Sequence, residues 1–323
     1  MKICVVGAGA IGGLLGARLA RAGYEVSLIA RGPHLAALRA RGLTLRAKKE
    51  TYTLPVNATD DVAGMGQQDA VFIALKAYSI AAMLPRLAPL LGAQTVVIPA
   101  INGIPWWYFY KEGGRFDGEP AGRVDPGGAM LRSFDCGRIL GCVVHASAEV
   151  VEPGVVESKV GRRFILGEPD GSLSERAHAM AEVLVAAGFE APLTTRIRDA
   201  VWTKLIGNLA FNPVGALTCA RMDYTMSNPA IVDLLRAILA EGMRVGEAYG
   251  ARFDVSIDQR VDMARRIGNS KVSMLQDLER GRPIESEAIV GAVCEFGRRV
   301  GVPTPITDII YTLIRQRGLS TGR

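Results

Sequence analysis

The chain has few residues of the kinds that bind metals or form disulfides. Its 323 residues include three histidines and five cysteines. The cysteines, which form no CxxC pair and no cluster with histidine, are Cys4, Cys136, Cys142, Cys219 and Cys294. The histidines, which lie far apart in the sequence, are His34, His145 and His178. We therefore predict no metal site, histidines in loops or on the surface, and a reducing, cytoplasmic location.

The sequence also lacks a long hydrophobic run and a dense block of one charge. No uninterrupted apolar segment reaches the ~18 residues of a membrane-spanning helix, and the N-terminus lacks the basic leader and cleavage site of a secretory signal. The net charge is +6, but basic and acidic residues are interleaved, so we predict neither nucleic acid nor membrane as a partner. The C-terminal residues 315–323 are predicted to be a frayed, solvated tail.

The N-terminal stretch predicts a strand, a glycine-rich turn and a helix. Residues 2–6 are mostly apolar, and an apolar helical pattern continues after the turn Gly7-Ala8-Gly9-Ala10-Ile11-Gly12. In this setting Gly7 allows the turn, Gly9 lets the backbone approach a pyrophosphate, and Gly12 lets the helix lie close to the strand. All six residues of the turn are therefore candidates for binding a dinucleotide.

The end of the second predicted strand, residues 25–30, bears on the type of dinucleotide. An NAD site normally carries Asp or Glu at this position, whereas here Arg31 follows the strand. A guanidinium group suits a 2'-phosphate through its charge and its planar set of donors. We therefore predict NADP(H) rather than NAD; the alternative is a solvated loop arginine.

Two further strands end in polar residues that could meet a ligand. Residues 69–75 form a buried strand followed by Lys76, and residues 95–101 form another followed by Asn102 and Gly103. The carboxyl ends of strands in an open parallel sheet line the ligand crevice. Lys76 is therefore a candidate for cofactor phosphate or ribose, with a solvated lysine as the alternative. The Asn-Gly pair is a turn signal, and the Asn102 amide could also fix a nicotinamide or substrate.

The remainder of the first part mixes strand and helix patterns, and the last third is helical. Aromatic residues 106–110 are either a core plug or the wall of a substrate pocket, and residues 113–128 form an irregular excursion. Further predicted elements are a hairpin over 42–54, strands at 139–145, 155–158, 163–167 and 190–193, and helices at 35–41, 80–91 and 174–187. Later helices are predicted at 199–209, 231–249, 256–267, 286–300 and 304–315. We predict an α/β fold: a Rossmann-type dinucleotide-binding domain over 1–195, then an all-helical domain over 196–323.

The first helix of the second part carries a polar line. Lys204, Asn208 and Asn212 are spaced four residues apart and so share one helical stripe, with apolar residues on its flanks. Asparagine is a poor helix former, so this pattern indicates a line of polar groups facing a cleft rather than a solvated face. Residues 271–285 form a second polar cluster, which by itself is typical of a capped helix end.

Taken together, these motifs resemble the ketopantoate reductase family over essentially the whole chain. The resemblance implies a Rossmann domain and a helical domain with the active site between them, and NADPH-dependent reduction of 2-dehydropantoate to pantoate. It implies that Lys204 is the general acid and that Glu285 holds a substrate hydroxyl and orients the site. Substrate hydroxyls would be bound by Asn208 and Asn212, the carboxylate by Ser273, cofactor and substrate by Asn102, and the adenosine-side phosphate and ribose by Arg31 and Lys76.

Two departures leave alternatives open. Pro105 and the aromatic run follow the Asn-Gly turn, where this family usually has another glycine, and the excursion over 113–137 is long. We therefore also consider a relative that reduces a bulkier 2-oxo acid, and a non-catalytic NADP(H)-sensing module. Another alternative is the β-hydroxyacid dehydrogenase group, which also combines a Rossmann domain, a helical domain and a catalytic lysine. Those proteins typically have the spacing Lys-x2-Asn, whereas Lys204 and Asn208 have the spacing Lys-x3-Asn, which argues against this alternative. Ile231, Leu234, Leu235 and Ile238 could belong to a core or to a homodimer interface.

Overall fold

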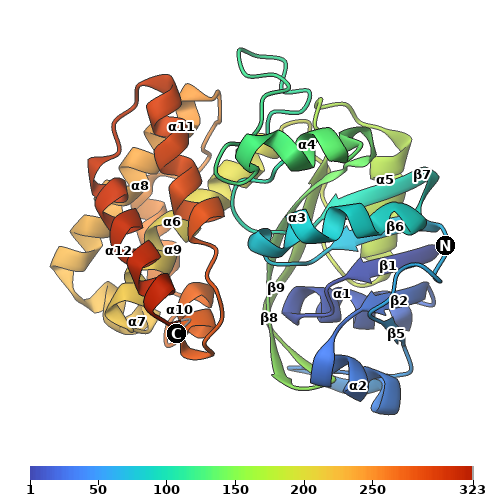
Figure 1. The fold of residues 1–323 in the computed structure, drawn as a ribbon. Helices are drawn as coiled ribbons and strands as arrows, with labels where there is room; N and C mark the ends of the chain where they lie inside the picture. Colours follow the sequence, from blue (N-terminus) through green and yellow to red (C-terminus); the bar gives the residue numbers. More distant parts are fainter. Residues whose placement is uncertain (322–323) are drawn as a thin grey trace. The chain divides into compact units, whose positions relative to one another are not determined.

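The computed structural model describes residues 1–321, which divide into two compact units (Figure 1). The sheet unit consists of Met1–Ile101, Trp106–Pro120 and Gly127–Ile197. The helical unit consists of Asn102–Pro105, Ala121–Pro126 and the described chain from Arg198 onward. Two short segments from the first half of the sequence thus belong to the helical unit.

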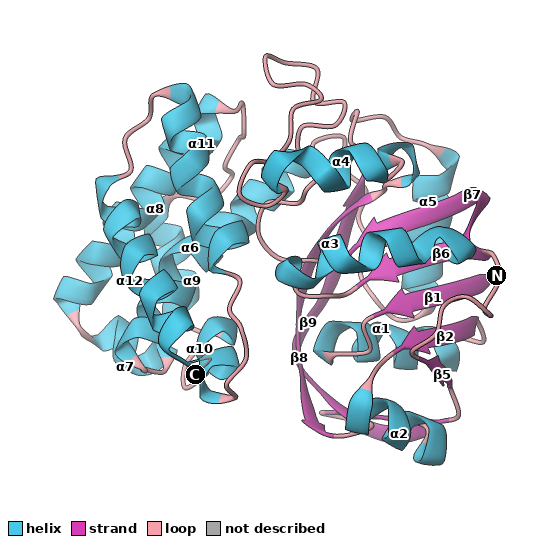
Figure 2. Ribbon diagram, viewed as in Figure 1, coloured by secondary structure: helices cyan, strands magenta, loops and turns pink. Residues whose placement is uncertain are grey.

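A five-stranded parallel sheet forms the centre of the sheet unit (Figure 2). Its strands are β1 (Lys2–Val6), β2 (Glu25–Ile29), β5 (Asn57–Thr59), β6 (Gln68–Ile73) and β7 (Leu91–Pro99). Their order is β5-β2-β1-β6-β7, with Val5 paired to Leu28 on one side and to Phe72 on the other. The inner strands are almost entirely buried, which is why they read as continuous apolar runs. The predicted Rossmann-type sheet is confirmed.

Most connections of this sheet are helical. The helices are α1 (Ala10–Arg21), α2 (Gly32–Arg41), and a broken run of η1 (Ala77–Ser79), α3 (Ile80–Met83) and η2 (Leu84–Leu90). We predicted one helix over 80–91, but only its first turn is α-helical. Pro85 and Pro89 explain the difference, because proline lacks an amide donor and its ring clashes within a regular α-helix.

A second, four-stranded sheet completes the sheet unit. Its strands are β3 (Leu43–Ala47), β4 (Glu50–Leu54), β8 (Gly141–Glu152) and β9 (Val155–Gly167), in the order β4-β3-β9-β8. The two strands predicted within 155–167 form one continuous strand that passes through Gly161 at φ +78°. Helix α5 (Glu175–Ala186) is capped by Ser174, as its sequence indicates. Residues 190–193 form isolated bridges to β9 and no full strand.

The aromatic run and the excursion that follows it are mostly irregular. The side chains of Trp106, Trp107, Tyr108 and Phe109 are at most 1% exposed. The excursion contains only the short helices η3 (Pro126–Gly128), α4 (Ala129–Ser133) and η4 (Cys136–Arg138). Of the two interpretations of the aromatic run, the core plug therefore agrees with the structure, since these four side chains lie in the interior of the sheet unit.

The described part of the last third, up to Thr321, forms helices without strands, as predicted (Figure 2). These are α6 (Ile197–Thr218), α7 (Met222–Ser227), α8 (Pro229–Ala248), α9 (Ile257–Arg265), α10 (Ser273–Glu279), the π-helical turn η5 (Glu287–Gly291), α11 (Ala292–Val300) and α12 (Pro305–Thr321). Leu235 and Ile238 on α8 are buried, so they belong to the core of this unit.

Helix α12 corrects the prediction of a frayed tail. It remains helical through Thr321, and the final two residues of the predicted tail lie outside the described part of the chain. Its first turn is held by the buried carboxylate of Glu241, which accepts hydrogen bonds from the backbone amides of Ile306 at 3.1 Å and Thr307 at 2.8 Å. Such a carboxylate stabilises the positive end of the helix dipole. The sequence gives no local sign of this contact, since Glu241 comes from α8.

Candidate active site

The glycine turn between β1 and α1 can only be built with glycine at two of its positions. Gly7 has φ +99°, a conformation that L side chains rarely adopt, and a Cβ there would fall 2.7 Å from the Leu75 side chain. A Cβ on Gly12 would overlap the Gly7 carbonyl oxygen and lie 3.1 Å from the Ala74 side chain. The amides of Gly7 and Ala8 donate to the Ile29 carbonyl on β2, at 3.1 and 3.0 Å. The turn is therefore packed closely on both neighbouring strands.

The start of α1 fits a pyrophosphate group. Gly9 is the N-cap, no side chain caps the helix, and no acidic residue lies in its first turn. A Cβ built on Gly9 would meet no atom within 4 Å, so the backbone is open to a ligand at this position. The unpaired amides and the helix dipole at such an N-terminus favour an anion. The residues present thus suit the phosphates of a dinucleotide.

Two cationic residues follow the strands on either side of β1. Arg31 comes after β2 as the N-cap of α2, and Lys76 comes after β6 as the N-cap of η1. The Arg31 side chain is exposed and makes no hydrogen bond or ion pair with any residue within 1–321. Because β2, β1 and β6 are adjacent and parallel, the sheet brings both residues to the same edge as the glycine turn. Arg31 is therefore available to a phosphate at this edge.

A second group of polar residues gathers in the helical unit. The Lys204 ammonium on α6 donates a hydrogen bond of 2.7 Å to the Asn102 side-chain oxygen, from the segment that follows β7. Asn208 and Asn212 continue the line along α6. Asn212 is only 6% exposed, and no hydrogen-bond partner in the described chain meets its Nδ2. A buried amide donor without a partner costs about 1–3 kcal/mol, which suits a group reserved for a ligand.

Glu285 and Ser273 also belong to the helical unit. Glu285 is buried just before the π-helical turn, and its carbonyl accepts from the Ile289 amide at 3.2 Å. Ser273 is the first residue of α10 and its side chain is exposed. The hydroxyl therefore lies at the N-terminal end of a short helix, where backbone amides are also unpaired.

Comparison with known proteins identifies the family. The family model "Ketopantoate reductase PanE/ApbA" matches residues 3–106, and "Ketopantoate reductase PanE/ApbA C terminal" matches residues 196–318. A 2-dehydropantoate 2-reductase of Mesorhizobium japonicum is 45% identical over 323 residues, covering 100% of this chain and 99% of the relative. The chain belongs to the ketopantoate reductase family.

Two further relatives agree with this assignment to the ketopantoate reductases. A 2-dehydropantoate 2-reductase of Archaeoglobus fulgidus is 30% identical, with coverage of 99% of this chain and 98% of the relative. The crystal structure of a candidate ketopantoate reductase from Ralstonia solanacearum MolK2 superposes with a TM-score of 0.94 at 40% identity, over 99% of this chain and 98% of that one. Membership makes the protein an NADP-dependent oxidoreductase and confirms the prediction of NADP(H) as its cofactor.

The structure of this ketopantoate reductase family member also adds a residue that sequence reasoning missed. Arg260 on α9 donates to the backbone carbonyl of Thr203, the residue before Lys204. A Cβ on Gly207 would lie 3.3 Å from the guanidinium, so the glycine leaves room for it. No carboxylate of the described chain pairs with Arg260, and burial lowers the pKa of its guanidinium. No local pattern in the sequence indicates this contact, since Arg260 comes from α9.

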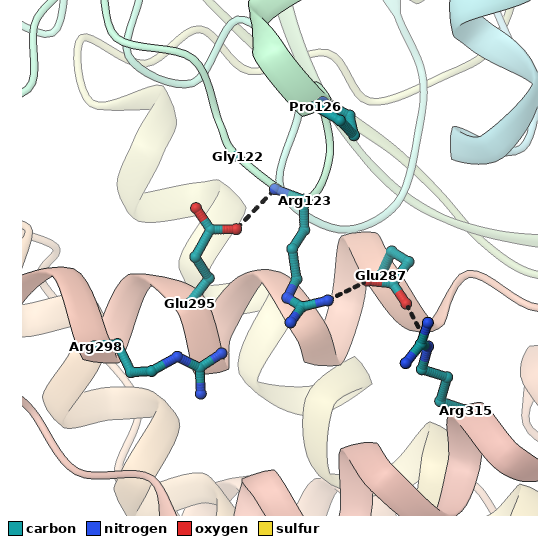
Figure 3. A pocket seen from close by; sticks show the side chains of 7 residues that line it. All are labelled: Gly122, Arg123, Pro126, Glu287, Glu295, Arg298 and Arg315. Atoms are coloured by element: carbon teal, nitrogen blue, oxygen red, sulfur yellow. Dashed lines mark hydrogen bonds and ion pairs between the residues drawn. The ribbon is translucent and has the colours of Figure 1, made fainter.

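A hollow of about 680 Å³ in the helical unit is lined by several charged side chains (Figure 3). Arg123 donates to Glu287 at 3.1 Å, its backbone amide donates to Glu295 at 2.7 Å, and Arg315 approaches Glu287 at 3.6 Å. These carboxylates compensate the cations of the hollow. The contacts fasten segment Ala121–Pro126 to the helices, and we assign no ligand to this place.

Neither a membrane-spanning helix nor a metal-binding cluster is found among residues 1–321. No helix among them is long and apolar enough to cross a membrane. No group of three or more His, Cys, Asp or Glu side chains in this range could hold a metal ion. The burial of Trp106, Trp107, Tyr108 and Phe109 argues against one of the two departures behind the bulkier-substrate alternative, because an aromatic pocket wall would need those rings at a surface.

Proposed function

We propose that the protein reduces 2-dehydropantoate to (R)-pantoate with NADPH, a step in the synthesis of pantothenate and coenzyme A. One observation carries this proposal. The Lys204 ammonium, on the polar line of α6, donates a hydrogen bond of 2.7 Å to the side-chain oxygen of Asn102 in the segment after β7. A 2-oxo acid that gains a hydride needs a proton donor for its oxygen and polar groups for its carboxylate and hydroxyl. The names of the Mesorhizobium and Archaeoglobus relatives support the choice of substrate.

The cofactor half of the reaction uses the edge of the parallel sheet. NADPH, when bound, supplies the hydride that reduces the carbonyl carbon. Within the turn Gly7-Ala8-Gly9-Ala10-Ile11-Gly12, the Gly7 and Ala8 amides already bond to Ile29, so the amides from Gly9 onward hold the pyrophosphate. Arg31 pairs with the 2'-phosphate. Lys76 binds on the adenosine side, and Asn102 holds both cofactor and substrate. The fit of Gly9 and Arg31 to anionic groups supports these roles.

The catalytic half uses the polar line of the helical unit. Lys204 stabilises the negative charge that develops on the ketone oxygen and donates a proton to it. Asn208 and Asn212 bind substrate hydroxyls, and the partnerless Nδ2 of Asn212 supports that role. Ser273 binds the carboxylate, and Glu285 holds a hydroxyl and orients the site. Each group acts by hydrogen bonding or proton transfer, so the chain needs no covalent intermediate.

Substitution of Lys204 tests this proposal. We expect Lys204→Ala to lower kcat with 2-dehydropantoate by at least about a hundredfold, because the proton donor is lost, and to leave the Kd for NADPH nearly unchanged. The measurement is NADPH absorbance, with 2-dehydropantoate and a panel of larger 2-oxo acids. Lys271→Ala is the matched control, since Lys271 is an exposed lysine paired with Glu279.

Three results would overturn the proposal. Unchanged turnover in Lys204→Ala would remove Lys204 from the mechanism. A higher kcat/KM with a larger 2-oxo acid would favour the alternative substrate. A flat absorbance trace with every 2-oxo acid would favour an NADP(H)-sensing module.

We also propose a cytoplasmic location and a homodimer. All five cysteines are free thiols, which suits a reducing compartment.

On α12, Ile309 is 61% and Leu313 is 50% exposed, one helical turn apart, which suits a small apolar contact between copies. Sedimentation of the wild type and of Leu313→Lys tests the dimer; a monomeric wild type would exclude it.

A further inference from the structure

The segment Asn102–Pro105 is held by the helical unit through one backbone contact. The chain on either side of it, up to Ile101 and from Trp106, belongs to the sheet unit. The Ile104 amide donates a hydrogen bond of 2.9 Å to the Ala288 carbonyl. Ala288 lies in the π-helical turn that begins two residues after Glu285. The segment that carries Asn102 is therefore seated directly on this turn.

The π-helical turn makes the Ala288 carbonyl available for that contact. In an α-helix the Ala292 amide would bond to Ala288, four residues earlier. Here the Ala292 amide bonds to the Glu287 carbonyl, five residues earlier. Single π turns within helices occur often at functional sites. The change of register thus opens one carbonyl toward the segment that contacts Lys204.

Gly103 permits the close approach of the two backbones. It has φ +81°, and a Cβ on it would fall 2.7 Å from the Ala288 carbonyl carbon and 2.9 Å from the Ala288 side chain. Real Cβ atoms essentially never come within 3.0 Å of such neighbours. Any larger residue must therefore push the segment off the turn. Asn102, the residue immediately before Gly103, accepts the hydrogen bond from Lys204.

We propose that Gly103 is a positioning residue: by fitting against Ala288 it fixes the Asn102 side-chain oxygen at the Lys204 ammonium. This inference rests on the proposed function and adds to it a requirement on the backbone. Gly103 contributes no side chain to the reaction, and it acts through the orientation of its neighbour. A displacement of about 1 Å at a reacting group can cost a hundredfold in rate.

The test compares two glycines with the same backbone conformation. We expect Gly103→Ala to lower kcat about ten- to a hundredfold, while the KM for NADPH, to which Asn102 contributes one contact among several, changes by a smaller factor. Gly113→Ala is the matched control: Gly113 has φ +78°, but a Cβ there meets nothing within 4 Å. It carries the same backbone strain without the clash, so its kcat should remain near wild type. Equal kcat values in the two variants would overturn the proposal.

A double-mutant cycle separates positioning from general damage. If Gly103 acts through Asn102, Gly103→Ala should lower kcat little further in the background of Asn102→Ala. Additive losses would overturn the proposal. If Gly103→Ala does not fold, Ala288→Val crowds the same contact from the other side and should give the same split between kcat and KM. Activity retained in Lys204→Ala would instead refute the proposed function, so the two failures can be told apart.

Discussion

The glycine turn of the sheet unit and the Lys204–Asn102 pair of the helical unit are built in different ways. The turn joins β1 to α1 within a few residues, and its shape depends on glycines that are neighbours in the sequence. The pair joins side chains 102 residues apart, and its geometry depends on a third segment, the π-helical turn. The first is therefore a local device that a motif reveals. The Lys204–Asn102 pair depends on the fit of distant backbone segments. Substitutions at residues that touch no reactant can therefore disrupt its geometry.

The largest effect is expected from substitutions in the glycine turn. Gly12→Ala should abolish NADPH binding and lower stability by about 3 kcal/mol or more, because its Cβ would overlap the Gly7 carbonyl oxygen. Gly9→Ala should keep the wild-type Tm, since its Cβ meets no atom, yet weaken NADPH binding because a methyl group occupies the approach of the pyrophosphate. Calorimetric unfolding and NADPH titration check both. A Gly9→Ala protein that binds NADPH normally would contradict the assignment of the pyrophosphate to this turn.

A smaller effect is expected where the helical unit leaves a buried donor without a partner. Asn212→Leu removes an amide whose Nδ2 is unpaired. We therefore expect the Tm to stay level or rise, while the KM for 2-dehydropantoate rises at least about tenfold. A Tm that stays level or rises, together with a weaker affinity for substrate, is typical of a group retained for a ligand rather than for folding. A KM equal to that of the wild type would show that the orphan amide has no part in binding substrate.

The contrast between the two regions also explains what the sequence could reveal. The strand, turn and helix at the N-terminus, and the change to helices near residue 196, follow from local patterns, and the structure contains them. Lys204, Asn208 and Asn212 could be grouped because one helix carries all three. Their link to Asn102 came only from the family resemblance, since no local pattern brings the segment after β7 to α6.

Other features depended on tertiary contacts that the sequence does not encode locally. The π-helical turn at Glu287–Gly291 lies in a stretch that reads as an ordinary helix. Arg260 gave no sign that it would reach α6. The chain from residue 315 was predicted to fray, but α12 stays helical through Thr321, and Arg317 near its end donates to the Cys219 sulfur at 3.7 Å. In each case a partner distant in sequence overrides local propensity.

The smallest effect is expected at a histidine near the glycine turn. His34 on α2 accepts a hydrogen bond from the Gly154 amide at 3.1 Å through Nδ1. Desolvation lowers the pKa of His34 below its ordinary value of about 6.5. The unfolded chain therefore takes up a proton near pH 6.5 while the folded chain resists it. His34 thus stabilises the sheet unit above that pH, and this contribution is lost as the pH falls below it.

One such group changes stability by at most about 1.4 kcal/mol per pH unit, which corresponds to about 3 °C in Tm. The fall in Tm between pH 7.5 and 5.5 should therefore be smaller in His34→Gln than in the wild type. The matched control is His178→Gln, at a histidine whose side chain is exposed. Parallel slopes in all three proteins would mean that the ring is protonated as easily in the folded chain as in the unfolded one. The fit of α2 against Gly154 would then be insensitive to the charge of His34.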